Sequence, residues 1–134
     1  MTGPAVAAYA VTLVTFLVVD GIWLFLMASR FYRAHLGSLM AEQPSWPAAV
    51  AFYPLFAFGL TVLAVWPALE SGSVGRAALL GGTLGLVAYG TYDLTNQATL
   101  KGWPAVVTLV DLAWGTVLSS VVAGLAVWII RRFA

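Results

Sequence analysis

Four long apolar stretches, separated by polar links, dominate the pattern of hydrophobic positions along the chain. They cover about residues 5–28, 47–67, 75–98 and 103–130. A helix needs roughly 20 mainly apolar residues to cross the hydrocarbon core of a bilayer, and each stretch meets this length. The pattern predicts an all-α membrane protein, in which residues 1–134 form a single domain. The expected architecture is an antiparallel bundle of four transmembrane helices.

The links between the stretches differ in length. Residues 69–73 and 99–102 are so few that each requires a tight antiparallel hairpin. The link over residues 29–46 is longer, and its apolar residues recur at helical spacing. This spacing is typical of a short amphipathic helix that lies in the membrane interface. An extension of the first span by two turns explains it equally well.

Composition agrees with a membrane protein. Hydrophobic residues make up 62% of the chain and charged residues only 8%, whereas soluble domains carry about 25%. The lipid bilayer is therefore the expected surroundings, and a net charge of +1 gives no reason to expect a nucleic-acid partner. The chain has no cysteine and one histidine, His35, which excludes disulfides, thiolate sites and a multi-histidine metal site within one copy. We predict no metal site, and the sequence indicates no cofactor.

Basic residues do not decide the orientation in the membrane. We call the side on which the first span begins the near side, and the opposite side the far side. Three basic residues are expected on each side: Arg76, Arg131 and Arg132 on the near side, and Arg30, Arg33 and Lys101 on the far side. The positive-inside rule then gives no answer. Either other features set the orientation, or copies insert both ways and pair antiparallel.

Small residues predict where two of the helices approach closely. The third span contains Gly81, Gly82 and Gly85, and the fourth contains Gly115 and Ser119. Glycine and serine at such spacing let helix backbones come close together in membranes. We therefore expect tight packing between the third and fourth spans.

All three aspartates fall inside predicted spans. An ionisable residue at the centre of a membrane helix costs roughly 2.5–3.5 kcal/mol, so Asp20, Asp93 and Asp111 each need a reason. Counting a rise of about 1.5 Å per residue places all three in one layer, toward the far side of the bilayer. Three acids from three helices are thus predicted to meet.

Aromatic and amide side chains accompany these acids. An indole follows Asp20 and another follows Asp111 at a spacing of i, i+3, which keeps each pair on one side of its helix. The predicted ligand-binding residues are Asp20, Trp23, Tyr89, Tyr92, Asp93, Asn96, Asp111 and Trp114. Carboxylates, phenols, indoles and an amide would suit a cation, or a ligand with polar groups and an apolar body.

Basic residues at the far-side mouth form the predicted rim of this site. Arg30, Arg33 and Lys101 could snorkel inward and pair with one or two of the acids. Shared protons or a bound cation are the other ways to balance the charge. A purely structural role is the alternative, because buried polar groups that tie membrane helices together contribute around 0.6 kcal/mol each.

Several runs of residues resemble one known family. They are residues 19–23, 31–33, 92–103 and 110–116, and the Tyr-Asp-Leu-Thr-Asn run that begins at Tyr92 is the most distinctive. Together they resemble the small bacterial membrane proteins of domain-of-unknown-function family 2177. The resemblance implies a multi-pass protein with four spans in the bacterial inner (cytoplasmic) membrane, and it brings no activity or ligand. The matching motif residues are Asp20, Trp23, Tyr92, Asp93, Thr95, Asn96, Lys101, Asp111 and Trp114.

Three functions remain open at this level. The first is a binding protein or transporter for a small-molecule or lipid ligand or a cation, with proton coupling as one version. Because four short helices enclose little volume, it favours a homodimer. The second is a non-catalytic accessory or scaffold subunit of a membrane complex. The third is a membrane-embedded lipid-modifying enzyme, which is disfavoured because the chain has no Ser-His-Asp set and no metal-ligand motif such as HExxH.

Overall fold

The computed structural model describes residues 2–133, and within them it contains helices and short links but no strand. The elements are, in order, α1 (Thr2–Met27), η1 (Ala28–Tyr32), α2 (Arg33–Leu36), η2 (Gly37–Leu39), α3 (Trp46–Leu60), η3 (Thr61–Val65), α4 (Trp66–Ser71), α5 (Val74–Thr99) and α6 (Ala105–Phe133). Segments η1 and η3 are π-helical, and η2 is a 3₁₀ turn. The predicted all-α, antiparallel four-helix bundle is confirmed.

Three of the four long helices are long and apolar enough to cross a membrane by length and composition. They are the continuous helical segments Thr2–Leu39, Trp46–Ser71 and Ala105–Phe133. Helix α5 has 26 residues, a sufficient length, but it carries more glycine and threonine and ends with several polar side chains. That α5 is the remaining span stays a prediction.

The link over residues 29–46 is mostly helical. Helix α1 continues through η1 into α2 and η2, so the structure has the extension of the first span, and the irregular part is confined to residues 40–45. The α-helical part ends at Leu36, and its C-cap Gly37 has a φ of 51°, which suits a residue without a side chain. The two short links turn at glycines in the left-handed region, Gly72 and Gly102, in agreement with tight hairpins.

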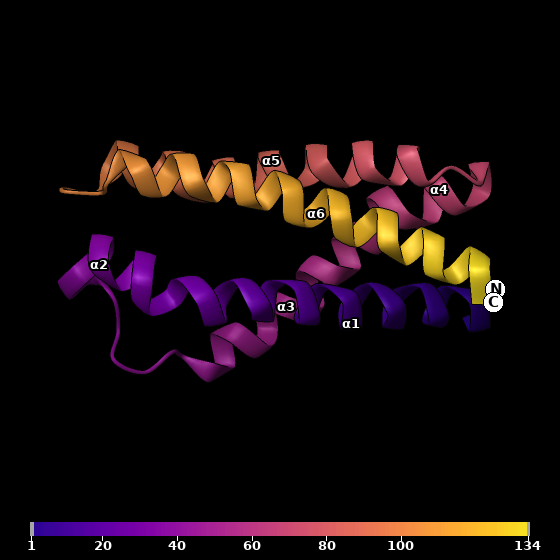
Figure 1. Cartoon of the computed structure of the whole chain (residues 1–134), viewed down its shortest axis with the longest axis horizontal. Coiled ribbons are helices and arrows are strands. Elements are labelled where there is room, and N and C mark those ends of the chain that lie inside the picture. Colours follow the sequence, from indigo (N-terminus) through magenta and orange to yellow (C-terminus); the bar gives the residue numbers. More distant parts are fainter. Residues whose placement is uncertain (1, 134) are drawn as a thin grey trace.

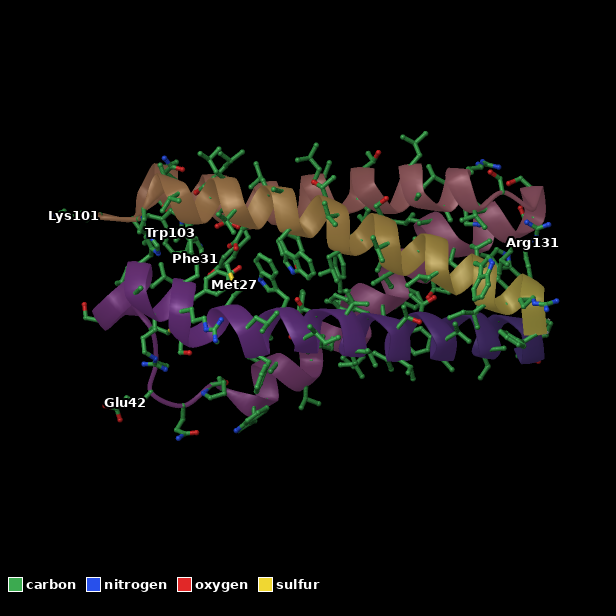
Figure 2. The ribbon with its side chains drawn as sticks, in the orientation of Figure 1. Met27, Phe31, Glu42, Lys101, Trp103 and Arg131 are labelled. Atoms are coloured by element: carbon green, nitrogen blue, oxygen red, sulfur yellow. The ribbon has the colours of Figure 1, made fainter. Side chains whose placement is uncertain are left out.

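The helices are arranged in two layers at the far end and meet at the near end. Figure 1 shows α5 and α6 side by side along their length, with α1 below α6, and the segment from α3 to α4 crossing obliquely from the α1 layer to the α5 layer. Helix α1 begins and α6 ends at the same end of the bundle. Figure 2 shows Arg131 at this near end and Lys101 at the opposite, far end.

Close contact between α5 and α6 depends on glycine. A Cβ atom added to Gly85 would lie 2.1 Å from the carbonyl oxygen of Gly115, and one added to Gly81 would lie 2.5 Å from that of Ser119. Such distances leave no room for any side chain. The predicted tight packing of these two helices is confirmed.

The near half of the bundle holds the apolar core. Fully buried side chains from α1, α3, η3 and α6 pack there as one cluster that includes Phe16, Leu60, Val65, Leu118 and Val127. The three aspartates are buried as well, but they lie toward the far end of the helices that carry them. The fold thus places the main apolar core in the near half and the buried acids toward the far half.

Candidate functional site

A cavity of about 470 Å³ lies in the far half of the bundle. It exists because α3 packs against α1, whereas only its continuation η3 packs closely against α5 and α6. The far-side half of α3 therefore diverges from the α5–α6 pair and leaves space between the layers. Side chains from α1, η1, α3, α5 and α6 line this space.

Asp20 of α1 is held on the cavity wall by two other helices. The Tyr53 hydroxyl of α3 donates a hydrogen bond to Oδ2 of Asp20 at 2.8 Å. The Trp114 indole Nε1 of α6 donates to Oδ1 at 3.1 Å. Both carboxylate oxygens thus have neutral donors, and the Asp20 residue is only 6% exposed.

Asp111 of α6 is held by the far-side extension of the first helix. The Tyr32 hydroxyl donates to Oδ1 of Asp111 at 2.5 Å, and the Trp23 indole Nε1 donates to the Tyr32 oxygen at 3.1 Å. Tyr32 is the last residue of η1, so the wider π-helical turn sets the direction from which its ring reaches α6.

A pair of stacked indoles joins the two aspartate centres. The rings of Trp23 and Trp114 lie 4.1 Å apart between centroids and are within 8° of parallel. Trp23 belongs to the hydrogen-bond chain that ends at Asp111, and Trp114 belongs to the one that ends at Asp20. The two carboxylates are therefore parts of one network that spans α1, η1, α3 and α6.

Asp93 of α5 lies behind this network. It is fully buried, and neither of its carboxylate oxygens has a hydrogen-bond partner within residues 2–133. The antiparallel register of α5 and α6, in which Gly85 and Tyr89 both lie against Gly115, places Asp93 about level with Asp111 on the neighbouring helix. A buried carboxylate without a donor is costly, so Asp93 is the least satisfied polar group of the site.

The remaining predicted site residues differ in whether they line the cavity. Tyr89 lines the cavity, with its ring against the backbone of Gly115. Tyr92 also lines the cavity, but it is 58% exposed at the edge. Asn96 is half-buried one turn beyond Tyr92 and is not a lining residue.

The predicted rim stays apart from the acids. Arg30, Arg33 and Lys101 are exposed, and within residues 2–133 none of them forms an ion pair with Asp20, Asp93 or Asp111. Over the same part of the chain, no three His, Cys, Asp or Glu residues are grouped to hold a metal ion. The charge of the acids is thus not compensated by the chain's own cations.

Sequence reasoning missed several residues of the site. Tyr53 and Tyr32 make the direct bonds to the aspartates, and Phe52 and Phe56 form the cavity wall on α3. Tyr32 stands in one of the motif runs, and its phenol could have been read as a polar handle. Tyr53 could have been found because a tyrosine hydroxyl inside an apolar span needs a hydrogen-bond partner.

Comparisons with known proteins identify a family. The family model described as "Predicted membrane protein (DUF2177)" matches residues 5–128. No curated protein and no solved structure matches the chain.

Proposed function

We propose that this chain, which belongs to the DUF2177 family of predicted membrane proteins, binds a small amphipathic molecule inside the bilayer. One observation carries the proposal: two buried carboxylates, Asp20 and Asp111, stand on the wall of a cavity of about 470 Å³ that is otherwise mostly aromatic and aliphatic. An apolar pocket with a few convergent polar groups is the usual form of a small-molecule site.

The cavity lies in the far half of the bundle. The apolar core around Phe16, Leu60 and Leu118 fills the near half, and polar side chains buried on that side of the aspartates, such as Thr12, Thr61 and Ser119, are uncharged. This arrangement favours binding over free passage through the bundle. Carrying a ligand across the membrane would require α3 to move relative to α5 and α6.

A single copy suffices for the proposed binding. The cavity is enclosed by helices of one chain, so the volume argument for a homodimer loses its force. A homodimer remains a separate prediction. The proposed location is the bacterial inner membrane, as the family resemblance implies, and cell fractionation of the native host would test it.

A photoreactive probe tests the proposal directly. The purified protein in lipid nanodiscs is labelled with a diazirine-bearing octyl glucoside, and the labelled residues are identified by mass spectrometry. We expect saturable labelling of lining residues such as Phe52 and Tyr89. Ala88→Phe, which fills the cavity, should abolish this labelling. The matched variant Val87→Phe, at a neighbouring position that is 60% exposed, should leave it unchanged.

Two labelling results would contradict the proposal. Labelling that does not saturate and is spread over lipid-facing residues would mean that the probe only dissolves in the surrounding lipid. The same conclusion would follow if Ala88→Phe and Val87→Phe were labelled alike.

A further inference from the structure

The site gathers three carboxyl groups, and no cationic side chain within residues 2–133 donates a hydrogen bond to them. Every hydrogen-bond donor to Asp20 and Asp111 is a neutral phenol or indole. Neutral donors orient a carboxylate and lower its desolvation cost, but they leave its charge in place. A buried charge that lacks a counter-charge is expensive in a membrane protein.

The surroundings of Asp93 also favour a positively charged ligand. Its carboxyl is fully buried on α5, about level with Asp111 of α6, and both of its oxygens lack a donor within residues 2–133. On Asp111 itself, only Oδ1 accepts a hydrogen bond from this part of the chain. A cation placed in the cavity against Asp111 would interact with both carboxyl groups at once.

The aromatic wall suits an organic cation. Trp23, Trp114, Tyr32, Tyr53 and Tyr89 all line the cavity around the carboxylates. The faces of indole and phenol rings attract ammonium groups, with a contribution that rises as the cation loses water. A bare metal ion would find few oxygen ligands here, whereas an alkylammonium would find ring faces as well as carboxylates.

The opening of the cavity indicates where an apolar tail would lie. Phe52 of α3 and Tyr92 of α5 line the cavity and are 41% and 58% exposed, on two helices that diverge toward the far side. Nearer the middle, Phe56 and Tyr89 meet edge to face at 6.1 Å between centroids. Aromatic rings therefore close the inner end of the opening between α3 and α5. The side chains on either side of the opening are exposed where lipid is expected.

From these observations we propose that the ligand is a cationic amphiphile, an alkylammonium in chemical class. Its head group pairs with Asp111 and Asp20 inside the aromatic wall. Its chain extends between α3 and α5 toward the lipid. The inference rests on the proposed function and adds the charge of the head group and the route of entry.

Competition among matched amphiphiles tests the head group. Octyltrimethylammonium, octylphosphocholine, octyl phosphate and unlabelled octyl glucoside are compared as competitors of the photoprobe, at equal membrane-bound concentrations in nanodiscs. We expect the ammonium compound to compete best, by about tenfold or more over octyl glucoside. Asp111→Asn should remove this advantage, because asparagine keeps an oxygen acceptor for Tyr32 but loses the negative charge.

Two further variants keep the test decisive. Asp20→Asn is the second site variant. It should also reduce the preference for the ammonium compound, and it keeps the test possible if Asp111→Asn does not fold. Glu42→Gln is the matched control, because Glu42 is an exposed acid in the far-side link, outside the bundle (Figure 2). It should keep the full preference for the ammonium compound.

The results separate the two proposals. If octyl glucoside competes as well as the ammonium compound in the wild-type protein, or if Asp111→Asn and Asp20→Asn keep the preference, the cationic head group is wrong while amphiphile binding stands. If no octyl compound competes and the probe does not saturate, both the binding function and the ligand class are wrong.

Discussion

Asp93 is the residue whose environment is hardest to reconcile with a merely structural role. A polar group kept only to tie helices together would be expected to bond to another helix, and neither oxygen of Asp93 does so within residues 2–133. Asp20 and Asp111, by contrast, each accept bonds from other elements. The difference between these aspartates yields a prediction about stability.

Replacing Asp93 by asparagine should not weaken the fold. Asparagine has nearly the same shape, carries no charge and brings an amide N–H₂ that could donate to Asp111. We expect Asp93→Asn to raise the free energy of unfolding by about 1 kcal/mol, measured by denaturant titration in a fixed detergent. Asp20→Asn is the comparison, and it should lower stability because its N–H₂ cannot accept from the second of its two donors.

A loss of stability in Asp93→Asn would contradict this account. It would show that the Asp93 carboxylate stabilises the fold even when no ligand is added.

At the scale of elements, the contact between α5 and α6 is set by residues without side chains. Gly85→Ala would place a methyl group 2.1 Å from the carbonyl oxygen of Gly115, and overpacking of this kind costs about 1–3 kcal/mol. We expect a loss of thermal stability of that order. Gly21→Ala on α1 meets nothing within 4 Å and should be neutral or slightly stabilising, because alanine favours helix. Equal effects of the two substitutions would mean that α5 and α6 are not closely packed.

The limits of sequence reasoning are also clearest at the scale of elements. The four apolar stretches and their hairpins follow from local length and composition, but the first helical segment continues to Leu39, beyond the predicted end near residue 28. The common layer of the aspartates was expected from helix rise alone, and in the structure Asp20 and Asp111 line one cavity while Asp93 is buried behind it. The divergence of α3 from α5 could not be predicted, because it depends on how η3 fits against the α5–α6 pair, and Tyr53 and Phe52 join the site only through it.

For the whole molecule, the bundle places its two short hairpin links at opposite ends. Because the chain has no cysteine, single cysteines can report sidedness without background. We expect Glu70→Cys and Lys101→Cys to react with a membrane-impermeant maleimide from opposite sides of sealed membranes. Complete reaction of both positions from the same side would contradict the antiparallel arrangement.

The same experiment decides between the two views of orientation. A single orientation gives complete reaction of each cysteine from one side only. Copies that insert both ways would give partial reaction of each position from both sides, in proportions that match between Glu70→Cys and Lys101→Cys.

The stacked indoles at the centre of the site also have an optical consequence. Two parallel rings 4.1 Å apart are close enough for their ultraviolet transitions to couple, so Trp23 and Trp114 should give a paired positive and negative band in circular dichroism. A molecule that enters beside them and tilts either ring would change the sign or size of these bands. The chain thus carries an intrinsic spectroscopic reporter at the junction between its two aspartate centres.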